Sequence, residues 1–190
     1  MVAGYLGSLG GMSDVQRSPA NRAVLFAREV GRLLLDVSGS RFRYVMTAWL
    51  IGTVPTIMLM PFLYAAKATF HIQLPRVEMN YGFAIAALIV APLIETGLML
   101  LTYYALGLLI WRSRVLRSLV LAALAAWAHL ISGGWLHVAG VLWLFVVLSF
   151  ALSAWTERRA RDAFIVVTSI HFLHNAAALA LAGLLAHYAA

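Results

Sequence analysis

Five long apolar segments follow one another after residue 43, and short stretches that carry most of the charged residues separate them. The segments are Tyr44–Ala66, Tyr81–Trp111, Val115 to about Ile131, Leu136–Trp155 and Ala163 to about Ala186. An α-helix needs about 20 consecutive apolar residues to cross a bilayer. Four segments reach that length, and the third is slightly short of it. The pattern predicts an all-α fold, a polytopic membrane bundle of about five transmembrane helices.

The second segment is longer than one crossing requires and contains a single charged residue, Glu95. Its length predicts that the helix tilts, kinks or begins outside the membrane. Pro92 is the expected position of a kink, because proline removes a backbone donor and disturbs the preceding turn.

The basic residues are distributed unevenly along the chain. Twelve of the 14 lie before the first segment, between the second and third, or between the fourth and fifth, at Arg17, Arg22, Arg28, Arg32, Arg41, Arg43, Arg112, Arg114, Arg117, Arg158, Arg159 and Arg161. Only Lys67 and Arg76 fall on the other side. Cytoplasmic loops carry the excess of Lys and Arg, so we expect a cytoplasmic N-terminus and a C-terminus outside. A short five-helix chain of this kind is expected in a bacterial inner (plasma) membrane.

The composition excludes several classes of protein. Of the 190 residues, 63% are hydrophobic and 11% are charged, whereas water-soluble domains carry about 25% charged residues. The absence of cysteine excludes thiol nucleophiles, disulfides and Cys-ligated zinc. The net charge of +7 follows from the basic loops. Because no basic stripe is interleaved with aromatic residues, we expect no nucleic-acid partner.

The segment 1–43 is expected to form a cytoplasmic unit that precedes the transmembrane bundle of residues 44–190. Ser18 and Pro19 are typical of a helix start. Apolar residues recur after them at helical spacing, at Val24, Ala27, Val30, Gly31, Leu34 and Leu35, and charged residues fall mainly on the other side. The pattern predicts an amphipathic helix, which lies on the anionic inner leaflet or packs on the underside of the bundle.

Four polar residues inside the apolar segments are the candidate site: Glu95, His129, His171 and Asn175. An ionisable group at the bilayer centre costs about 2.5–3.5 kcal/mol on insertion scales and so marks a functional position. The helical rise of about 1.5 Å per residue puts Glu95, His129 and Asn175 about 25, 22 and 20 Å from the cytoplasmic loops, and His171 about 14 Å, the poorest fit. We expect these helices to deliver their polar groups to one layer, with the fourth helix structural.

These residue types in one layer indicate hydrolysis. A carboxylate beside an imidazole can take a proton from water, and a second imidazole with an amide can stabilise an oxyanion. Packing interpretations stand beside this one: a buried histidine often packs only against helices, and an asparagine in a membrane helix often bonds a neighbouring helix. Glu95 is the only acid within any segment. Packing alone therefore explains Glu95 less well than it explains the histidines and the asparagine.

The ordered set resembles the motifs of the CAAX protease and bacteriocin-processing (CPBP) family of glutamic intramembrane proteases, which includes type II CAAX prenyl endopeptidases. That family has Glu-Glu-x-x-x-Arg after Ala-Pro, then Phe-x-x-x-His, then His-x-x-x-Asn. Here the segment 91–95 resembles the first motif up to its leading glutamate, Glu95. His129 resembles the histidine of the second, and His171 with Asn175 resembles the third in full.

The resemblance covers about residues 81–186 and implies an endopeptidase that uses neither metal nor cofactor. It implies that Glu95 and His129 activate water and that His171 and Asn175 form an oxyanion hole. Members of the family trim prenylated CAAX proteins, process bacteriocins or remove C-terminal sorting tags. The implied partner is therefore a membrane-anchored protein or peptide.

The chain departs from the family pattern at three positions. Thr96 stands in place of the second glutamate, Leu100 in place of the arginine and Ala125 in place of the phenylalanine. An inactive member, acting as a membrane binding or immunity protein, is therefore one alternative. A haem or metal carrier that uses His129 and His171 as ligands is another.

Overall fold

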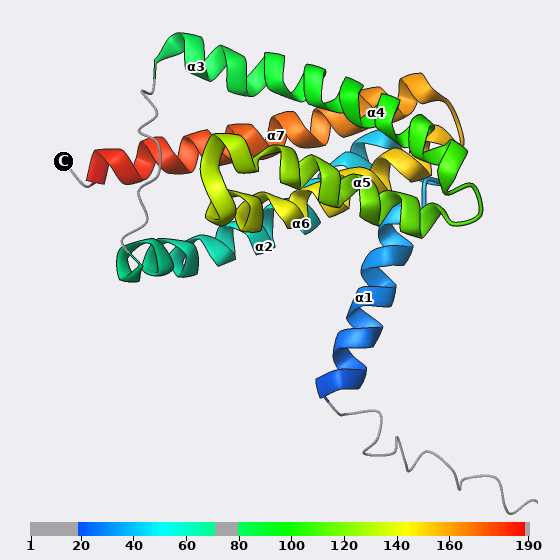
Figure 1. The fold of residues 1–190 in the computed structure, drawn as a ribbon, viewed down its shortest axis with the longest axis horizontal. Coiled ribbons are helices and arrows are strands. Elements are labelled where there is room, and N and C mark those ends of the chain that lie inside the picture. Colours follow the sequence, from blue (N-terminus) through cyan, green and yellow to red (C-terminus); the bar gives the residue numbers. More distant parts are fainter. Residues whose placement is uncertain (1–18, 71–79, 189–190) are drawn as a thin grey trace, which may run out of the picture. The chain divides into compact units, whose positions relative to one another are not determined.

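The computed structural model describes residues 19–70 and 80–188, and within these ranges all regular structure is helical (Figure 1). The elements are α1 Pro19–Leu35, α2 Arg41–Thr69, α3 Tyr81–Ile85, the π-helical turn η2 Ala86–Val90, α4 Ala91–Leu109, α5 Arg114–Ala128, α6 Leu130–Thr156 and α7 Ala160–Tyr188. The predicted all-α class is confirmed. Parts of the sequence interpretation refer to Arg76 and to the first 18 residues. These residues lie outside the described ranges.

Within the described residues, four helical stretches are long and apolar enough to cross a bilayer: Arg41–Leu63, Tyr81–Leu109, Gly134–Thr156 and Ala160–Leu184. They correspond to the first, second, fourth and fifth predicted segments and are consistent with a multi-pass membrane protein. The third segment forms α5, whose 15 residues extend about 22 Å, less than the hydrocarbon core of a bilayer.

The contacts divide the chain into two units, Met1–Leu33 and Leu34–Ala190. The division falls earlier than the boundary expected after residue 43. In the first unit, α1 begins at Pro19 as predicted and exposes Val24, Leu25 and Phe26. Arg32 pairs with Glu29 one turn before it, an arrangement that stabilises an isolated helix weakly.

In the second unit, α6 is the most buried helix and packs against α2, α5 and α7. α4 and α5 form one antiparallel hairpin and α6 and α7 another, and the α4–α5 and α6–α7 connections lie at the same end of the unit (Figure 1). Fully buried apolar side chains of α6 fill the centre, at Leu144, Phe145, Val147, Leu148, Leu152 and Trp155.

Proline determines how α2 and α6 meet. Pro55 lies inside α2 and has no backbone N–H, so it cannot donate to the carbonyl of Ile51, four residues earlier. Trp143 of α6 donates its indole N–H to this carbonyl over 2.8 Å. Gly52 lies beside it, where a Cβ would meet Leu144 at 3.2 Å. Small residues allow this close approach between membrane helices.

The chain changes direction sharply inside α6, at Gly134. This residue has φ 67° and ψ −172°, a backbone conformation that is essentially restricted to glycine. His129 ends α5 just before this change of direction, and His137 follows one turn after it. The glycine therefore determines how the first turns of α6 approach the end of α5.

We predict that Gly134→Ala lowers the free energy of unfolding by about 1–3 kcal/mol, because a Cβ strains this backbone conformation. Unfolding of the purified protein in mixed micelles, titrated with SDS, measures the change. Gly183→Ala is the matched control, since that glycine is helical and has open space around it. Equal stability of Gly134→Ala and the wild type would contradict the interpretation.

Candidate functional site

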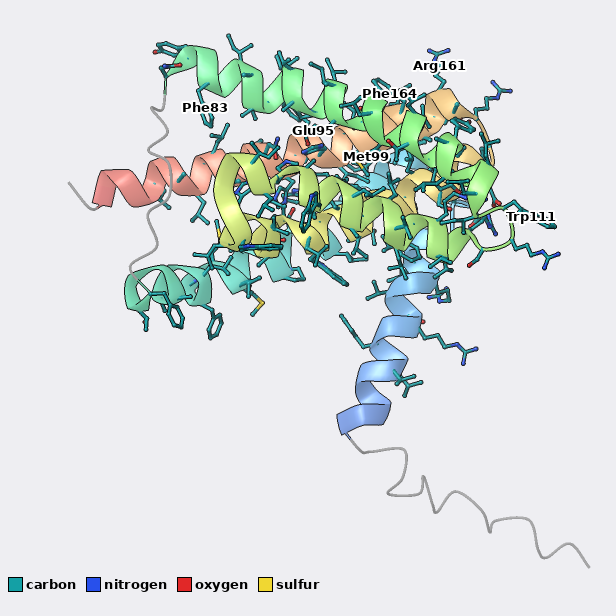
Figure 2. All side chains as sticks on the ribbon, viewed as in Figure 1. Phe83, Glu95, Met99, Trp111, Arg161 and Phe164 are labelled. Atoms are coloured by element: carbon teal, nitrogen blue, oxygen red, sulfur yellow. The ribbon has the colours of Figure 1, made fainter. Side chains whose placement is uncertain are left out.

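Glu95 of α4 lies between two imidazoles from two other helices. Its Oε2 atom is 3.8 Å from Nε2 of His129, at the end of α5, and 3.6 Å from Nε2 of His171 in α7. Figure 2 places Glu95 on the side of α4 that faces α7. The side chains of Glu95 and His129 are 29% and 21% exposed, whereas that of His171 is 5% exposed. The cluster thus has one closed side and one open side.

The orientation of His129 follows from its backbone contact. Its Nδ1 atom is 2.9 Å from the carbonyl oxygen of Ala125, one turn earlier in α5. A carbonyl oxygen only accepts hydrogen bonds, so Nδ1 carries the proton and donates. In the neutral ring this leaves the lone pair of Nε2 directed at Glu95.

The separations between Glu95 and the two imidazoles are longer than direct hydrogen bonds, which span about 2.7–3.2 Å. Polar groups at such distances commonly share a water molecule. Glu95 Oε2 and His171 Nδ1 are buried and have no hydrogen-bond partner among the described residues. Buried polar atoms without protein partners are candidates for bonds to water or to substrate.

Helix α6 contributes to the site, although the sequence predicts only a structural role for it. The ring of Phe145 lies 4.9 Å from that of His129 and 6.1 Å from that of His171, between centroids. Phe145 is 2% exposed. His137, also from α6, stacks on His129 at 5.5 Å. Phe145 therefore forms an apolar wall behind both imidazoles, a function that its position in a uniformly apolar segment does not reveal.

His171, and not Asn175, is the residue of α7 that contacts Glu95. His171 fits the predicted layer least well, yet it lies closest to Glu95. Helix α4 stops at Leu109 and α7 starts at Ala160. Counted from these ends, Glu95, His171 and Asn175 lie about 21, 17 and 23 Å along their helices. Height along the helix therefore does not select His171. The packing of α7 against the second segment, where Asn175 bonds Ala87, decides which residue contacts Glu95.

Asn175 lies one turn beyond His171 and contacts a different part of the second segment. Its Nδ2 atom donates to the carbonyl oxygen of Ala87, in η2, over 2.8 Å. The neighbouring His174 points to α2, where its Nδ1 is 3.0 Å from the hydroxyl oxygen of Thr53. Of the four predicted site residues, Glu95, His129 and His171 therefore form one cluster. The fourth, Asn175, bonds a backbone carbonyl instead.

Leu100 stands where the family pattern has an arginine, so this position gives Glu95 no guanidinium partner. Thr96 is fully buried and Leu100 is partly buried. Among the described side chains, the basic groups within ion-pairing distance of Glu95 are the two histidines, and no Lys or Arg is among them. Within the described part of the chain, an imidazole is therefore the group that can place a positive charge beside this carboxyl group.

A separate groove of about 590 Å³ runs between α2, η2–α4 and α7. Leu93 of α4 and Phe172 of α7 line it, along with Arg41 at the start of α2. Glu95 and His171 do not line it, although each is close in sequence to a residue that does. The groove is almost entirely apolar and lies apart from the polar cluster.

In the part of the chain that the structure describes, no group of three or more His, Asp or Glu is arranged to hold a metal ion. No family model, curated protein or solved structure matches this chain.

We predict that Phe145→Ala lowers the free energy of unfolding by about 3–5 kcal/mol, because it leaves a cavity behind both imidazoles. Phe145→Leu, which keeps most of the volume, should cost less than about 1.5 kcal/mol. SDS titration of the two variants against the wild type measures both. If the alanine variant is as stable as the leucine variant, the ring does not support the cluster.

Proposed function

We propose that this protein is an intramembrane glutamic-type endopeptidase that hydrolyses a peptide bond in a membrane-anchored protein. The observation that carries the proposal is the convergence of Glu95, His129 and His171 from three helices. Polar groups in apolar segments are costly, and the convergence of three of them on one point is better explained by chemistry than by packing. The proposal agrees with the family resemblance of the sequence.

In the proposed reaction, a water molecule bonded to Glu95 transfers a proton to the Glu95–His129 pair while its oxygen attacks the scissile carbonyl carbon. The carbonyl electron pair moves to oxygen and forms a tetrahedral oxyanion. The N–H of His171 donates to this oxyanion. The stored proton then passes to the amide nitrogen as the C–N bond breaks, which releases one carboxyl and one amine product.

The two imidazoles replace the arginine of the family pattern in this proposal. They can take up a proton when charge develops and lose it afterwards, whereas an arginine would remain charged throughout. An acid flanked by histidines can therefore stay in an apolar bundle without a permanent ion pair. The buried His171 and Phe145 close the rear of the site, so substrate reaches it from the exposed side of Glu95 and His129.

The substrate class follows from the location. A peptide bond must reach a carboxyl group that lies well inside an apolar helix, so the substrate must itself associate with the bilayer. CAAX-like proteins and C-terminal sorting tags, which the resemblance implies, meet this condition.

We further propose an inner-membrane topology with a cytoplasmic N-terminus and the C-terminus outside. Two ion pairs, Arg41 with Asp162 and Arg114 with Glu157, lie at the helix ends where the basic loops occur. α5 is short, but α6 returns the chain over a full span, so five segments still place the termini on opposite sides. The basic residues and exposed apolar residues of α1 suit the surface of an anionic leaflet.

The proposed mechanism predicts that Glu95→Gln and His129→Ala each lower cleavage by about 100-fold or more, because each removes the base that activates water. The assay uses proteoliposomes and a panel of lipid-anchored peptides in ¹⁸O-water. Mass spectrometry counts new carboxyl termini that carry one heavy oxygen.

Glu157→Gln is the matched control, because this acid lies at the exposed end of α6 and should leave cleavage unchanged. Cleavage at the wild-type rate by Glu95→Gln would refute the proposal. Biological function that persists in Glu95→Gln would favour the inactive binding or immunity protein.

The topology predicts that alkaline phosphatase is active when fused after residue 190 and inactive when fused after Arg161. Green fluorescent protein at the same two positions should give the opposite pattern. The physical basis is retention of the Arg-rich loops in the cytoplasm. Phosphatase activity at Arg161 would reverse the assignment.

A further inference from the structure

The turn before Glu95 has an unusual backbone. In η2 the Ala91 N–H donates to the carbonyl of Ala86, five residues earlier, as in a π-helix. Continuing that pattern, residue 92 would donate to the carbonyl of Ala87. Residue 92 is proline and has no N–H. Pro92 therefore leaves the Ala87 carbonyl without its helical donor in an apolar environment.

Asn175 supplies the missing donor. Its Nδ2 lies 2.8 Å from the Ala87 oxygen, so α7 satisfies a carbonyl that the second segment cannot satisfy itself. The residue is four positions after His171, on the same face of α7. Pro92 is likewise three positions before Glu95. The bond therefore connects α7 to the second segment one turn from His171 on α7 and about two turns from Glu95 on the second segment.

The same device occurs elsewhere in the chain. Pro55 frees the carbonyl of Ile51, and Trp143 of another helix donates to it. In both cases a side chain of a distant helix bonds a carbonyl that proline has left unpaired. This repetition supports a role for Asn175 in satisfying backbone.

We propose that Asn175 is a positioning residue, which bonds the Ala87 carbonyl freed by Pro92 and thereby fixes Glu95 opposite His171. The contact itself is independent of the reaction, while its consequence for catalysis rests on the proposed endopeptidase function. The oxyanion role that the family resemblance implies is the competing outcome, because the amide has a second N–H.

Stability tests the pairing through a double-mutant cycle. Asn175→Ala should raise the equilibrium constant for unfolding by about threefold to fifteenfold, the range for interhelical hydrogen bonds in membranes. In Pro92→Ala, the carbonyl of Ala87 gains a backbone donor, from residue 91 in an α-helix or from residue 92 in a π-helix. Asn175→Ala should therefore have almost no effect when combined with Pro92→Ala.

The reactivity of Glu95 tests the positioning role. Dicyclohexylcarbodiimide enters membranes and forms a stable adduct with carboxyl groups, and intact mass with peptide mapping measures its rate at Glu95. Asn175→Ala should raise this rate several-fold as the second segment separates from α7. The Pro92→Ala, Asn175→Ala double variant should label at the rate of Pro92→Ala alone. Loss of the adduct in Glu95→Gln verifies that Glu95 is the labelled residue, because glutamine has no carboxyl group.

Pro55→Ala combined with Asn175→Ala is the matched control and should not restore stability, because Pro55 acts on Ile51. Additive effects of Pro92→Ala and Asn175→Ala, with labelling of Glu95 unchanged, would overturn the proposal. A loss of cleavage of about 100-fold in Asn175→Ala that Pro92→Ala does not repair would assign Asn175 to the oxyanion instead. The two substitutions could show coupled effects on stability in a protein that cleaves no substrate. That result would support the contact between Asn175 and Ala87 and would reject the endopeptidase function.

Discussion

Backbone hydrogen bonding in an apolar solvent is the constraint on which the arrangement of this protein depends. A carbonyl group that loses its helical donor inside a bilayer finds no water to replace it. Pro55 and Pro92 each remove a backbone donor, and Trp143 and Asn175 each donate to a carbonyl freed in this way. Each proline thus disturbs one helix and also specifies which neighbour must pack against it.

The charged and titratable groups are separated along the bundle. Ion pairs that involve arginine, such as Arg41 with Asp162, lie at the helix ends. The interior cluster pairs one carboxyl group with two imidazoles. Because each member of this cluster can be neutral, the bundle need not hold an isolated charge. Phe145 and the short α5 then determine which side of the cluster stays open.

Much of the fold follows from apolar length. Four of the five predicted segments correspond to helices that can span a bilayer, and their bounds agree within a few residues. The short third segment became the 15-residue helix α5, and the chain changes direction beyond it at Gly134, inside α6. A glycine inside a long apolar sequence does not reveal a positive φ, because that conformation arises only when two helices pack on either side of it.

The candidate site was predictable as a set of residue types and only partly as a geometry. Glu95, His129 and His171 stand out because ionisable groups are costly in apolar segments. Depth along the helix favours Asn175 over His171 as the partner of Glu95, yet the packing of α7 against the second segment brings His171 to Glu95 and Asn175 to Ala87. Phe145 carried no polar signal at all, so its place behind the imidazoles could not be inferred.

The sequence by itself determined which segments are apolar enough to cross a membrane, which polar residues they contain and where proline removes a backbone donor, since these are properties of single residues and their order. The tertiary structure alone decided which groups meet. Residues three positions apart on a helix point about 60° apart. His171 faces Glu95 and His174 faces Thr53, and only the packing of the helices decides which of the two histidines meets the carboxyl group.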